Sequence, residues 1–384
     1  MKVEFCRHNL DDKDKREVRK ALDSIFLTTG EWTRTFEEKF AAYLGCKFVV
    51  GVSSCTSALE LALKCLDIGP GDEVITTPMS FIATANAVEY CRATPVFVDV
   101  EADTGNLDAE RIEAAITSRT KAILPVHLYG QMCDMRKITA IARKHGLKII
   151  EDCAHCIEGT RDGIRVGELA DISCYSFYAT KNITCGEGGA LACHDSDVYE
   201  WLIKARQHGM SASAADRYTH LYRHYDMEFL GHKCNMNNIQ GAMLIHQIDR
   251  VDSLLTERQR IAGLYEDAFR DNHAVAYPRD LSTGKHSRHL FTLWVAADKR
   301  DACMHSFQKA GVGVAVNYRS IHLMSYYRNK YGYNRGSFPN CEKIGSATLT
   351  IPLYPGMTPD EIQYVADTVN RVTRDYGVTG ADNI

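Results

Sequence analysis

The sequence predicts an α/β protein in which helices cover a large, mostly parallel sheet and a smaller α/β domain follows. The first observation is a regular alternation of short apolar runs and helical patterns over residues 48–152. Strands that alternate with helices form parallel sheets with helices on both faces. The second observation is a shorter alternation that begins at residue 290. We therefore expect a large domain over residues 1–270 and a small domain over residues 271–384.

Composition narrows the class of protein. The 384 residues are 45% hydrophobic and 24% charged, with a formal net charge of -4, as in an ordinary globular protein. Basic residues are scattered, so we expect no nucleic-acid partner. We see no export signal and no run long and apolar enough to span a membrane, and we expect a cytoplasmic protein.

The fourteen cysteines are expected to be reduced residues of the core. Cys153-Ala-His-Cys156 has the CxxC form of a redox or zinc motif. Because the chain has no second CxxC, we expect no metal site.

Each predicted element follows from a local pattern. Apolar residues at helical spacing predict a helix over Asp11–Phe26 and a second helix that contains Phe36, Phe40 and Leu44. The predicted strands of the large domain are Phe48–Gly51, Val74–Thr77, Pro95–Val100, Ala122–Val126 and Leu147–Asp152. The helices between them follow Ser53–Ser57, Ser80, Asp108 and Asp134.

The second half of the chain starts with helical patterns. We expect a helix over Val198–His208 and one long helix from Asn237 to about Phe269, with an irregular excursion over Ser211–Gly231 between them. The small domain is predicted to contain strand Leu290–Val295, helix Arg300–Ala310, strand Gly313–Asn317 and a last helix that opens at Thr358-Pro-Asp-Glu361.

Lys181 is the most informative single residue. It lies between an apolar, aromatic run and the glycine-rich turn Gly186–Gly189. A lysine that loses hydration has a lowered pKa and a larger share of the neutral amine that attacks carbonyl carbons to form a Schiff base. A lysine whose stem packs while its head reaches water is the more common case for any single lysine.

Other candidates follow predicted strands, where parallel sheets bind ligands. Asp152 ends a strand and is of a type that keeps a pyridine nitrogen protonated, although it also suits a helix cap. Ser53–Ser57 opens a helix whose N-terminus suits a phosphate, but serine caps are common. Phe81 suits stacking on a flat ring, and an isolated phenylalanine is more often a core residue.

Six ordered motifs carry a resemblance to a known family. The chain resembles the DegT/DnrJ/StrS family of pyridoxal-phosphate-dependent sugar aminotransferases, which have fold type I, from about Asp12 to the last helix. The motifs are Val52–Glu60, Gly69–Pro78, Pro125–Gln131, Glu151–His155, Ser176–Ile183 and Gly186–Gly189.

The resemblance implies a role for each residue that matches a family position. Lys181 would form the Schiff base with the cofactor and move the proton between cofactor and substrate carbons. Asp152 would pair with the pyridine nitrogen, Phe81 would stack on the ring, and His155 would lie near the phenolic oxygen, where many members have glutamine. The positions that match phosphate contacts are Thr56, Ser57 and Ser176.

The resemblance also implies a homodimer with shared active sites. Asn235 matches an asparagine that reaches the phosphate from the neighbouring subunit in one branch of the family, whereas many members have arginine there and asparagine at the position of Lys233. The residues in segments that line the sugar pocket of relatives are Thr29, Gly30, Tyr178 and His322.

The implied reaction moves an amino group from an amino acid, most often glutamate, to a keto sugar carried on a nucleotide, with pyridoxamine phosphate formed between the two half-reactions. Three alternative functions would require different residues. A sugar dehydratase of this fold carries histidine in place of Lys181, and a non-catalytic regulatory homologue is expected to lose Asp152 or Lys181. A nicotinamide-dependent dehydrogenase needs a GxGxxG after the first parallel strand, which this chain lacks.

Overall fold

A seven-stranded sheet forms the centre of the computed structural model, which describes residues 1–211 and 224–376. Its strand order is β1-β9-β8-β5-β4-β2-β3. Their bounds are β1 Phe48–Val52, β2 Glu73–Thr76, β3 Thr94–Phe97, β4 Thr120–Leu124, β5 Lys148–Asp152, β8 Ile172–Ser176 and β9 Gly189–Cys193.

The sheet is mostly parallel, as predicted. Among its seven strands β9 is the reversed one, because it pairs antiparallel with both β1 and β8, and the other six run in one direction. Strands buried on both faces read as continuous apolar runs rather than as alternation. Strand β9, buried at every position, has this pattern in the sequence, whereas β8 is equally buried and also contains Ser173 and Ser176.

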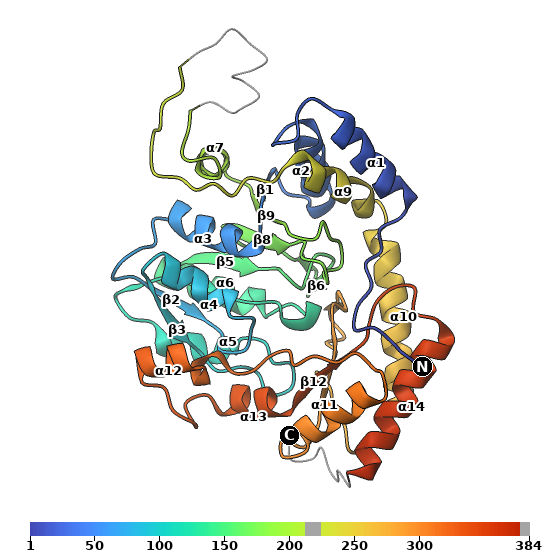
Figure 1. The fold of residues 1–384 in the computed structure, drawn as a ribbon. Coiled ribbons are helices and arrows are strands. Elements are labelled where there is room, and N and C mark those ends of the chain that lie inside the picture. The colour runs from blue at the N-terminus through green and yellow to red at the C-terminus, as the bar shows by residue number, and fades with distance from the viewer. Residues whose placement is uncertain (212–223, 377–384) are drawn as a thin grey trace.

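Helices cover both faces of this sheet (Figure 1). One face packs against α3 Cys55–Cys65, α4 Ala83–Tyr90 and α7 Ser196–Ala205, through residues such as Leu59 and Leu202. The other face packs against α2 Glu31–Leu44, α6 Met135–His145 and α9 Asn238–Ile248, through residues such as Phe40 and Ile138. The predicted helix over Asp108–Ile116 is shorter, with α5 Ala109–Ile112 followed by a 3-10 turn, η1 Glu113–Ala115.

The single long helix predicted from Asn237 is wrong. The structure has two helices, α9 and α10 Val251–Phe269, with the break at Asp249–Arg250. Helix α9 packs on α2 and on α1 Asp12–Asp23, whereas α10 runs on to pack against the last helix. Arg250 also turns toward α1, where its guanidinium binds the Asp14 carboxylate at 2.6 Å. These separate packing surfaces require a change of direction that a continuous apolar pattern does not reveal.

The C-terminal part is built on a two-stranded antiparallel sheet, β11 Phe291–Trp294 and β12 Thr348–Ile351. Helix α10 packs here beside α11 Arg300–Lys309 and α14 Pro359–Asp375. Helix α14 begins with the predicted capping box, because Thr358 Oγ1 accepts from the Glu361 N–H and the Glu361 carboxylate accepts from the Thr358 N–H. The division of the chain at residue 270 stays a prediction.

The predicted strand Gly313–Asn317 is wrong, since this segment pairs only at one isolated bridge between Ala315 and Thr350. The strand that pairs with β11 instead comes from β12, which the sequence pattern did not single out. Two further unpredicted helices, α12 Ser325–Tyr331 and α13 Pro339–Ala347, return the chain to the large sheet and pack near β3 and α4. A small sheet of β6 Thr160–Arg161, β7 Ile164–Arg165 and β10 Gly284–Lys285 lies between the two parts.

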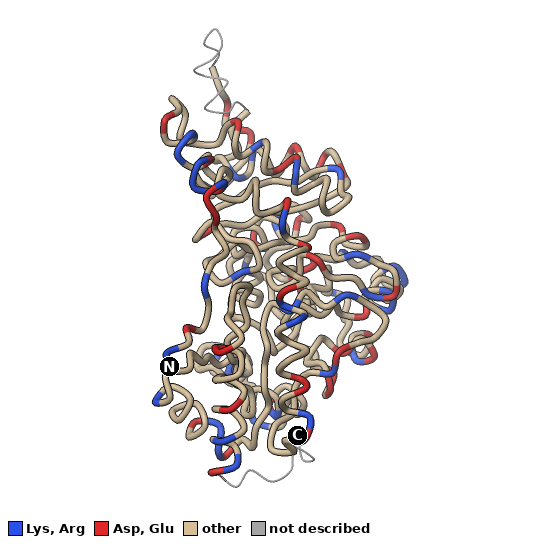
Figure 2. The backbone as a smooth tube through the Cα atoms, turned by 90° about the vertical axis from the view of Figure 1, so that its right-hand side faces the viewer, with Lys and Arg blue, Asp and Glu red and all other residues tan. Residues whose placement is uncertain are grey.

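Acidic and basic residues are interspersed along the backbone throughout the molecule (Figure 2). All fourteen cysteines are free, and most of them are buried, as predicted. None of the helices in the described part of the chain is both long enough and apolar enough to cross a membrane.

Candidate active site

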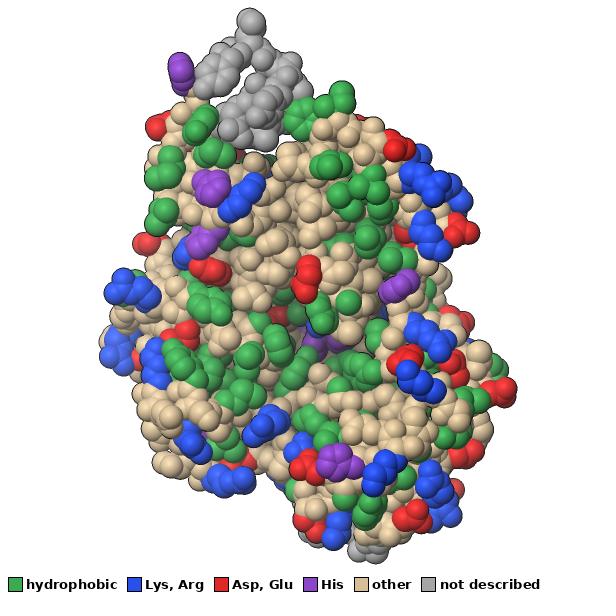
Figure 3. Space-filling model, in the orientation of Figure 1, with side chains coloured by type: hydrophobic (Ala, Val, Ile, Leu, Met, Phe, Trp, Pro, Cys, Tyr) green, Lys and Arg blue, Asp and Glu red, His purple; other side chains and the backbone are tan. Residues whose placement is uncertain are grey.

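A cavity of about 620 Å³ lies at the carboxyl edge of the large sheet. Figure 3 shows a hollow near the middle of this face, with hydrophobic side chains around it and histidine inside it. Parallel sheets bind ligands at this edge, so the cavity lies where the sequence predicts a ligand. The sequence-predicted residues that line it are Thr56, Phe81, Asp152, His155, Ser176, Tyr178 and Lys181.

Lys181 lies in the loop between β8 and β9. The loop is fixed by Gln247 of α9, whose side chain accepts from the Thr184 N–H at 3.0 Å and donates to the Thr184 carbonyl at 2.7 Å. Over the residues that the structure describes, the Lys181 ammonium has no carboxylate partner within ion-pair distance. Burial lowers the pKa of Lys181 to about 8, against the opposing effects of Cys55 and Asp152. A substantial share of this amine is therefore neutral near physiological pH.

Asp152 ends β5 and faces the same cavity while remaining buried. Its two carboxylate oxygens accept from the Thr84 hydroxyl at 2.8 Å and from the Ala154 N–H at 3.1 Å. Burial raises the pKa of Asp152, while these hydrogen bonds and the Lys181 charge lower it. The residues after Asp152 form turns rather than a helix, so Asp152 is not a helix cap. Its position suits a cationic partner inside the cavity, whose charge would favour the ionised carboxylate.

The N-terminus of α3 forms another part of the cavity wall. Ser54 caps this helix, and its hydroxyl accepts from the Ser57 N–H at 3.1 Å. Ser57 itself does not belong to the cavity lining, whereas Thr56 does. A Cβ on Gly189 would lie 2.4 Å from the Ser54 carbonyl carbon, so only glycine lets the start of β9 pass this close. Free N–H groups at such a helix start attract a phosphate.

His155 is held as a neutral ring. Its Nδ1 accepts from the Tyr129 N–H at 3.2 Å, and its Nε2 lies 3.0 Å from the Tyr318 hydroxyl. Burial, with a smaller effect of the Lys181 charge, holds the pKa of His155 well below its usual range. Since Nδ1 accepts a backbone N–H, the ring proton is on Nε2 and is donated to Tyr318.

A buried polar network next to Lys181 was not predicted from the sequence. His289 lines the cavity, and its Nδ1 lies 3.2 Å from the Oδ1 of Asn182, the residue after Lys181. The Asn182 amide donates to both Glu158 oxygens, at 3.1 and 3.0 Å. Glu158 in turn forms a fully buried ion pair with Arg258 of α10. These residues lie far apart in sequence, and no local pattern connects them.

The two aromatic candidates at the rim are accessible. Phe81 is 56% exposed and Tyr178 is 46% exposed, and both line the cavity. Phe81 also lies beside Tyr318, with the ring centroids 6.1 Å apart. Their exposure leaves ring surface available for a ligand.

Thr29, Gly30 and Asn235 form a separate group that does not line this cavity. The Asn235 amide donates to the Thr29 hydroxyl at 2.6 Å, and the Lys233 ammonium donates to Asn235 Oδ1 at 2.6 Å. Gly30 caps α2, where a Cβ would lie 2.8 Å from Asn238 Nδ2. Thr29 and Asn235 are therefore brought together, but neither they nor Gly30 share the cavity of Lys181 within this chain.

His322 also lies outside the cavity lining, and its side chain is fully buried. Its Nε2 is 3.1 Å from Glu342 Oε1, and its ring packs edge-on against Phe338 at 4.8 Å. Burial lowers the pKa of His322, and Glu342 opposes this shift. These contacts favour a packing position, and a part in a sugar pocket stays a prediction.

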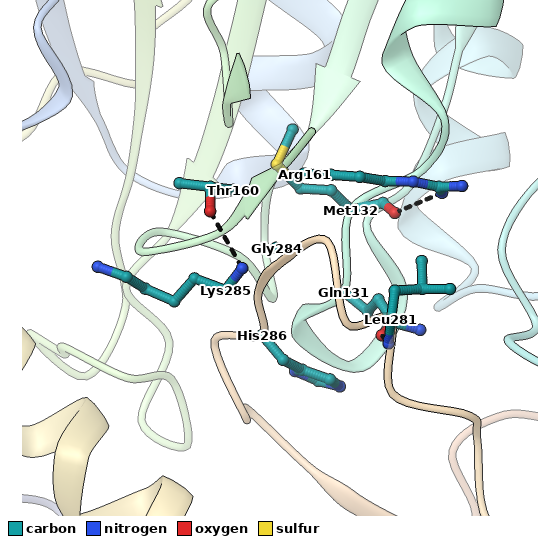
Figure 4. A pocket seen from close by; sticks show the side chains of 8 residues that line it. All are labelled: Gln131, Met132, Thr160, Arg161, Leu281, Gly284, Lys285 and His286. Atoms are coloured by element: carbon teal, nitrogen blue, oxygen red, sulfur yellow. Dashed lines mark hydrogen bonds between the residues drawn. The ribbon is translucent and has the colours of Figure 1, made fainter. Parts of the chain in front are cut away.

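Other polar clusters in the described residues do not form a comparable site. A pocket of about 10 Å³ beside the small sheet, lined by residues such as Arg161, Lys285 and His286, has room for about one water molecule (Figure 4). His127, Glu151 and Cys153 are close enough to hold a metal ion, but both ring nitrogens of His127 already have protein partners, Glu151 at 2.8 Å and the Cys133 N–H at 3.2 Å.

Comparison with known proteins identifies the family. Residues 8–370 match the DegT/DnrJ/EryC1/StrS aminotransferase family. The chain is 40% identical over 373 residues to the spore coat polysaccharide biosynthesis protein SpsC of Bacillus subtilis (strain 168), which covers 96% of this chain and 95% of SpsC. It is 35% identical over 376 residues to GDP-perosamine synthase of Caulobacter vibrioides, which covers 97% of this chain and 98% of that relative.

The fold agrees with these relatives. The putative sugar aminotransferase Spr1654 from Streptococcus pneumoniae, in its PMP form, superposes with a TM-score of 0.91 at 30% identity, over 97% of this chain and 99% of that structure. The same protein has also been solved in its PLP form. The predicted fold type I architecture is thereby confirmed. The chain belongs to the DegT/DnrJ/EryC1/StrS aminotransferase family, and its cofactor is pyridoxal 5′-phosphate.

Proposed function

We propose that this enzyme transfers an amino group from an amino acid, glutamate as the first candidate, to the keto group of a nucleotide-linked sugar. The observation that carries the proposal is the buried Lys181 amine without a carboxylate partner in the described residues, placed in one cavity with the Asp152 carboxylate. Both residues are required for transamination, whereas a protein with a purely structural role gains nothing from burying them.

The donor set of the cavity fits the cofactor. The N-terminus of α3 at Thr56, together with Ser176, would hold the phosphate, and Gly189 lets β9 pass close to this helix start. Asp152, kept in place by Thr84, would bind the protonated pyridine nitrogen, and the exposed ring of Phe81 would cover the flat face. His155 would lie near the phenolic oxygen. A carboxylate, an amine and a helix N-terminus in one cavity match the three polar ends of pyridoxal phosphate.

When bound, the cofactor acts as an electron sink that makes the proton on the reacting carbon acidic. Lys181 is the residue of this chain that carries that proton, since a lysine with a pKa near 8 is able both to accept and to release it at physiological pH. Asp152 keeps the pyridine nitrogen protonated because its buried carboxylate favours a nearby positive charge. Lys181 would transfer the proton in both half-reactions, and the direction of transfer with the keto sugar would be the reverse of that with the amino-acid donor.

The choice of a nucleotide-linked sugar is supported by relatives and by cavity size. GDP-perosamine synthase carries a nucleotide sugar in its name, and SpsC is named for polysaccharide biosynthesis. A cavity of about 620 Å³ lies within the usual range of small-molecule sites, about 300–1,000 Å³. We place the enzyme in the cytoplasm, where its fourteen free cysteines stay reduced.

The purified enzyme is expected to show a near-visible absorption band of the lysine-bound cofactor, and borohydride followed by peptide mass mapping should place the label on Lys181. Addition of glutamate should remove the band, and a 4-keto nucleotide sugar should restore it with formation of an amino sugar. A panel of 3-keto and 4-keto nucleotide sugars would define the acceptor. Release of a deoxygenated sugar without amine would instead support the dehydratase alternative, and an unchanged band with every amino acid would contradict aminotransfer.

We further propose a homodimer in which Asn235, with the nearby Thr29, completes the site of the neighbouring subunit. The support is that Asn235 and Thr29 are hydrogen-bonded to each other but do not line the cavity of their own chain. A site completed in this way requires a two-fold arrangement.

Mixed dimers of a Lys181→Ala subunit and an Asn235→Ala subunit are expected to regain activity above the sum of the two variants measured separately. In each mixed dimer one site combines an intact Lys181 with an intact Asn235 from the other chain. The measurement is turnover after joint refolding or co-expression, with each variant alone as a control. No gain on mixing would show that Asn235 acts within its own subunit or not at all.

A further inference from the structure

The N-terminal segment, residues 3–7, runs from the turn after α11 to the loop that carries Lys181. At one end Val3 pairs with the chain after α11, because its N–H donates to the Gly311 carbonyl at 2.8 Å and its carbonyl accepts from the Gly313 N–H at 2.8 Å. The Val3 side chain is buried in the core of the small domain. The segment is thus fixed rather than a loose end.

Two glycines make room for the N-terminal segment. A Cβ on Gly313 would lie 2.3 Å from the Phe5 nitrogen, and a Cβ on Gly311 would lie 2.7 Å from the Met1 carbonyl oxygen. Both distances are shorter than any real contact of a Cβ, so a side chain at either position would displace the segment. Glycine at positions 311 and 313 therefore allows the N-terminal segment, including Phe5, to pack directly against this backbone.

The other end of the segment contacts both parts of the molecule. Cys6 Sγ lies 4.0 Å from the carbonyl oxygen of Thr180, the residue before Lys181. Arg7 forms an ion pair with Glu361 of α14 at 3.1 Å and lies over the Tyr354 ring at 5.7 Å. Phe5, between these anchors, is consequently held beside the lysine loop, and its side chain lines the cavity.

We propose that Phe5 is a specificity-determining residue that packs against the apolar face of the sugar ring of the acceptor substrate. This inference rests on the proposed function. The residues of the cavity lining assigned above to the cofactor belong to strands of the large sheet or to the loops and helix starts that follow them, namely Thr56, Phe81, Asp152, His155, Ser176 and Lys181. Phe5 belongs instead to the small-domain wall, which it shares with Val316, Asn317 and Tyr318.

The chemistry of the acceptor explains why an aromatic ring suits this wall. A pyranose ring presents axial C–H groups on its faces, and a rigid aromatic side chain covers them with a large apolar surface at little cost in side-chain entropy. An amino-acid donor such as glutamate offers mainly charged groups, which a phenyl ring does not satisfy. Phe5 is therefore expected to act on the acceptor half of the reaction and not on the donor half.

The test compares the two half-reactions in the full-length holoenzyme. Phe5→Ala should lower kcat/KM for the keto nucleotide sugar by about 10- to 100-fold, the usual range for loss of an apolar contact in a substrate pocket. The cofactor band and the rate at which glutamate removes it should stay within about twofold of wild type, since the donor does not touch this ring. Phe5→Tyr, which keeps the ring, should retain most of the acceptor activity.

Gly313→Ala provides an independent test, because it moves the segment without altering a residue of the cavity lining. It should reproduce the acceptor defect of Phe5→Ala, while Gly263→Ala in α10, where no heavy atom lies within 4 Å of the added Cβ, should behave as wild type. Acceptor kinetics of Phe5→Ala within twofold of wild type, or an equal loss in the glutamate half-reaction, would overturn the role of Phe5 alone. A wild-type enzyme that aminates no keto nucleotide sugar would overturn the proposed function together with it.

Discussion

Replacing Lys181 with alanine is expected to lower kcat by at least about 10³-fold, within the range by which a positioned proton-transfer group accelerates a reaction. Of the lysines and arginines in the described chain, Lys181 is the one whose side chain lines the cavity. No other cationic amine in that lining is available to take over its proton transfer. The measurement is single-turnover conversion of glutamate by the holoenzyme, followed by absorption spectroscopy.

Two controls separate this effect from damage to the fold. Lys144→Ala removes an exposed lysine that pairs with Glu113 on the surface, and should leave turnover unchanged. Lys181→Arg keeps the positive charge but not a transferable proton near pH 8, and should be nearly as slow as Lys181→Ala. Partial recovery of Lys181→Ala with added methylamine would assign the loss to the missing amine. Full turnover of Lys181→Ala would contradict the mechanism.

Replacing Arg258 with methionine is expected to lower the free energy of unfolding of the apoprotein by about 3–5 kcal/mol, the cost of removing one partner of a buried ion pair. Arg258 is 2% exposed, and its loss would leave the buried Glu158 with the Asn182 amide as its remaining hydrogen-bond donor among the described residues. Urea unfolding of the apoprotein measures this change without the added stability that bound cofactor gives.

The matched control lies on the same helix. Arg260 pairs with Glu257 at 3.1 Å on the surface, where both side chains are about half exposed, and Arg260→Met should change the free energy of unfolding by less than about 1 kcal/mol. Equal effects of the two substitutions would show that the Arg258–Glu158 pair contributes no more than a surface pair. Because Asn182 follows Lys181, Arg258→Met should also lower the turnover of the holoenzyme. This loss of turnover should persist at temperatures where the protein is fully folded.

Much of the sheet and its binding edge could be predicted from local patterns. Short stretches of sequence are enough to predict apolar runs, helix caps such as Thr358, and the order of strands and helices. These features depend on local backbone geometry and on the period of the side chains. The same holds for Lys181 and Asp152, since strand ends of a parallel sheet meet at one edge. Residues placed by this rule are the ones that the structure brings together around the cavity.

Other features depend on contacts between distant segments. The reversal of β9 follows from the loop between β8 and β9, which has no crossover helix and therefore returns the chain antiparallel. The break before α10 arises because α9 and α10 pack against different helices. The segment Gly313–Asn317, which was predicted to be a strand, runs beside the N-terminal segment and forms a single bridge with β12. Local β propensity does not reveal this arrangement.

The sequence by itself determined the fold class, which follows from local periodicity, and the cofactor, which the resemblance of contiguous motifs to a known family implies. It also predicts Lys181 as the reactive lysine. Only the tertiary structure decided that Phe5 and His289, from segments outside those motifs, share a cavity with Lys181. It also shows that Glu158, which pairs with Arg258, binds the side chain of Asn182, the residue after Lys181. It also decided that Asn235 and His322 lie apart from that cavity. The physical reason is that burial, pKa shifts and buried hydrogen bonds are set by side chains that meet only after the chain has folded.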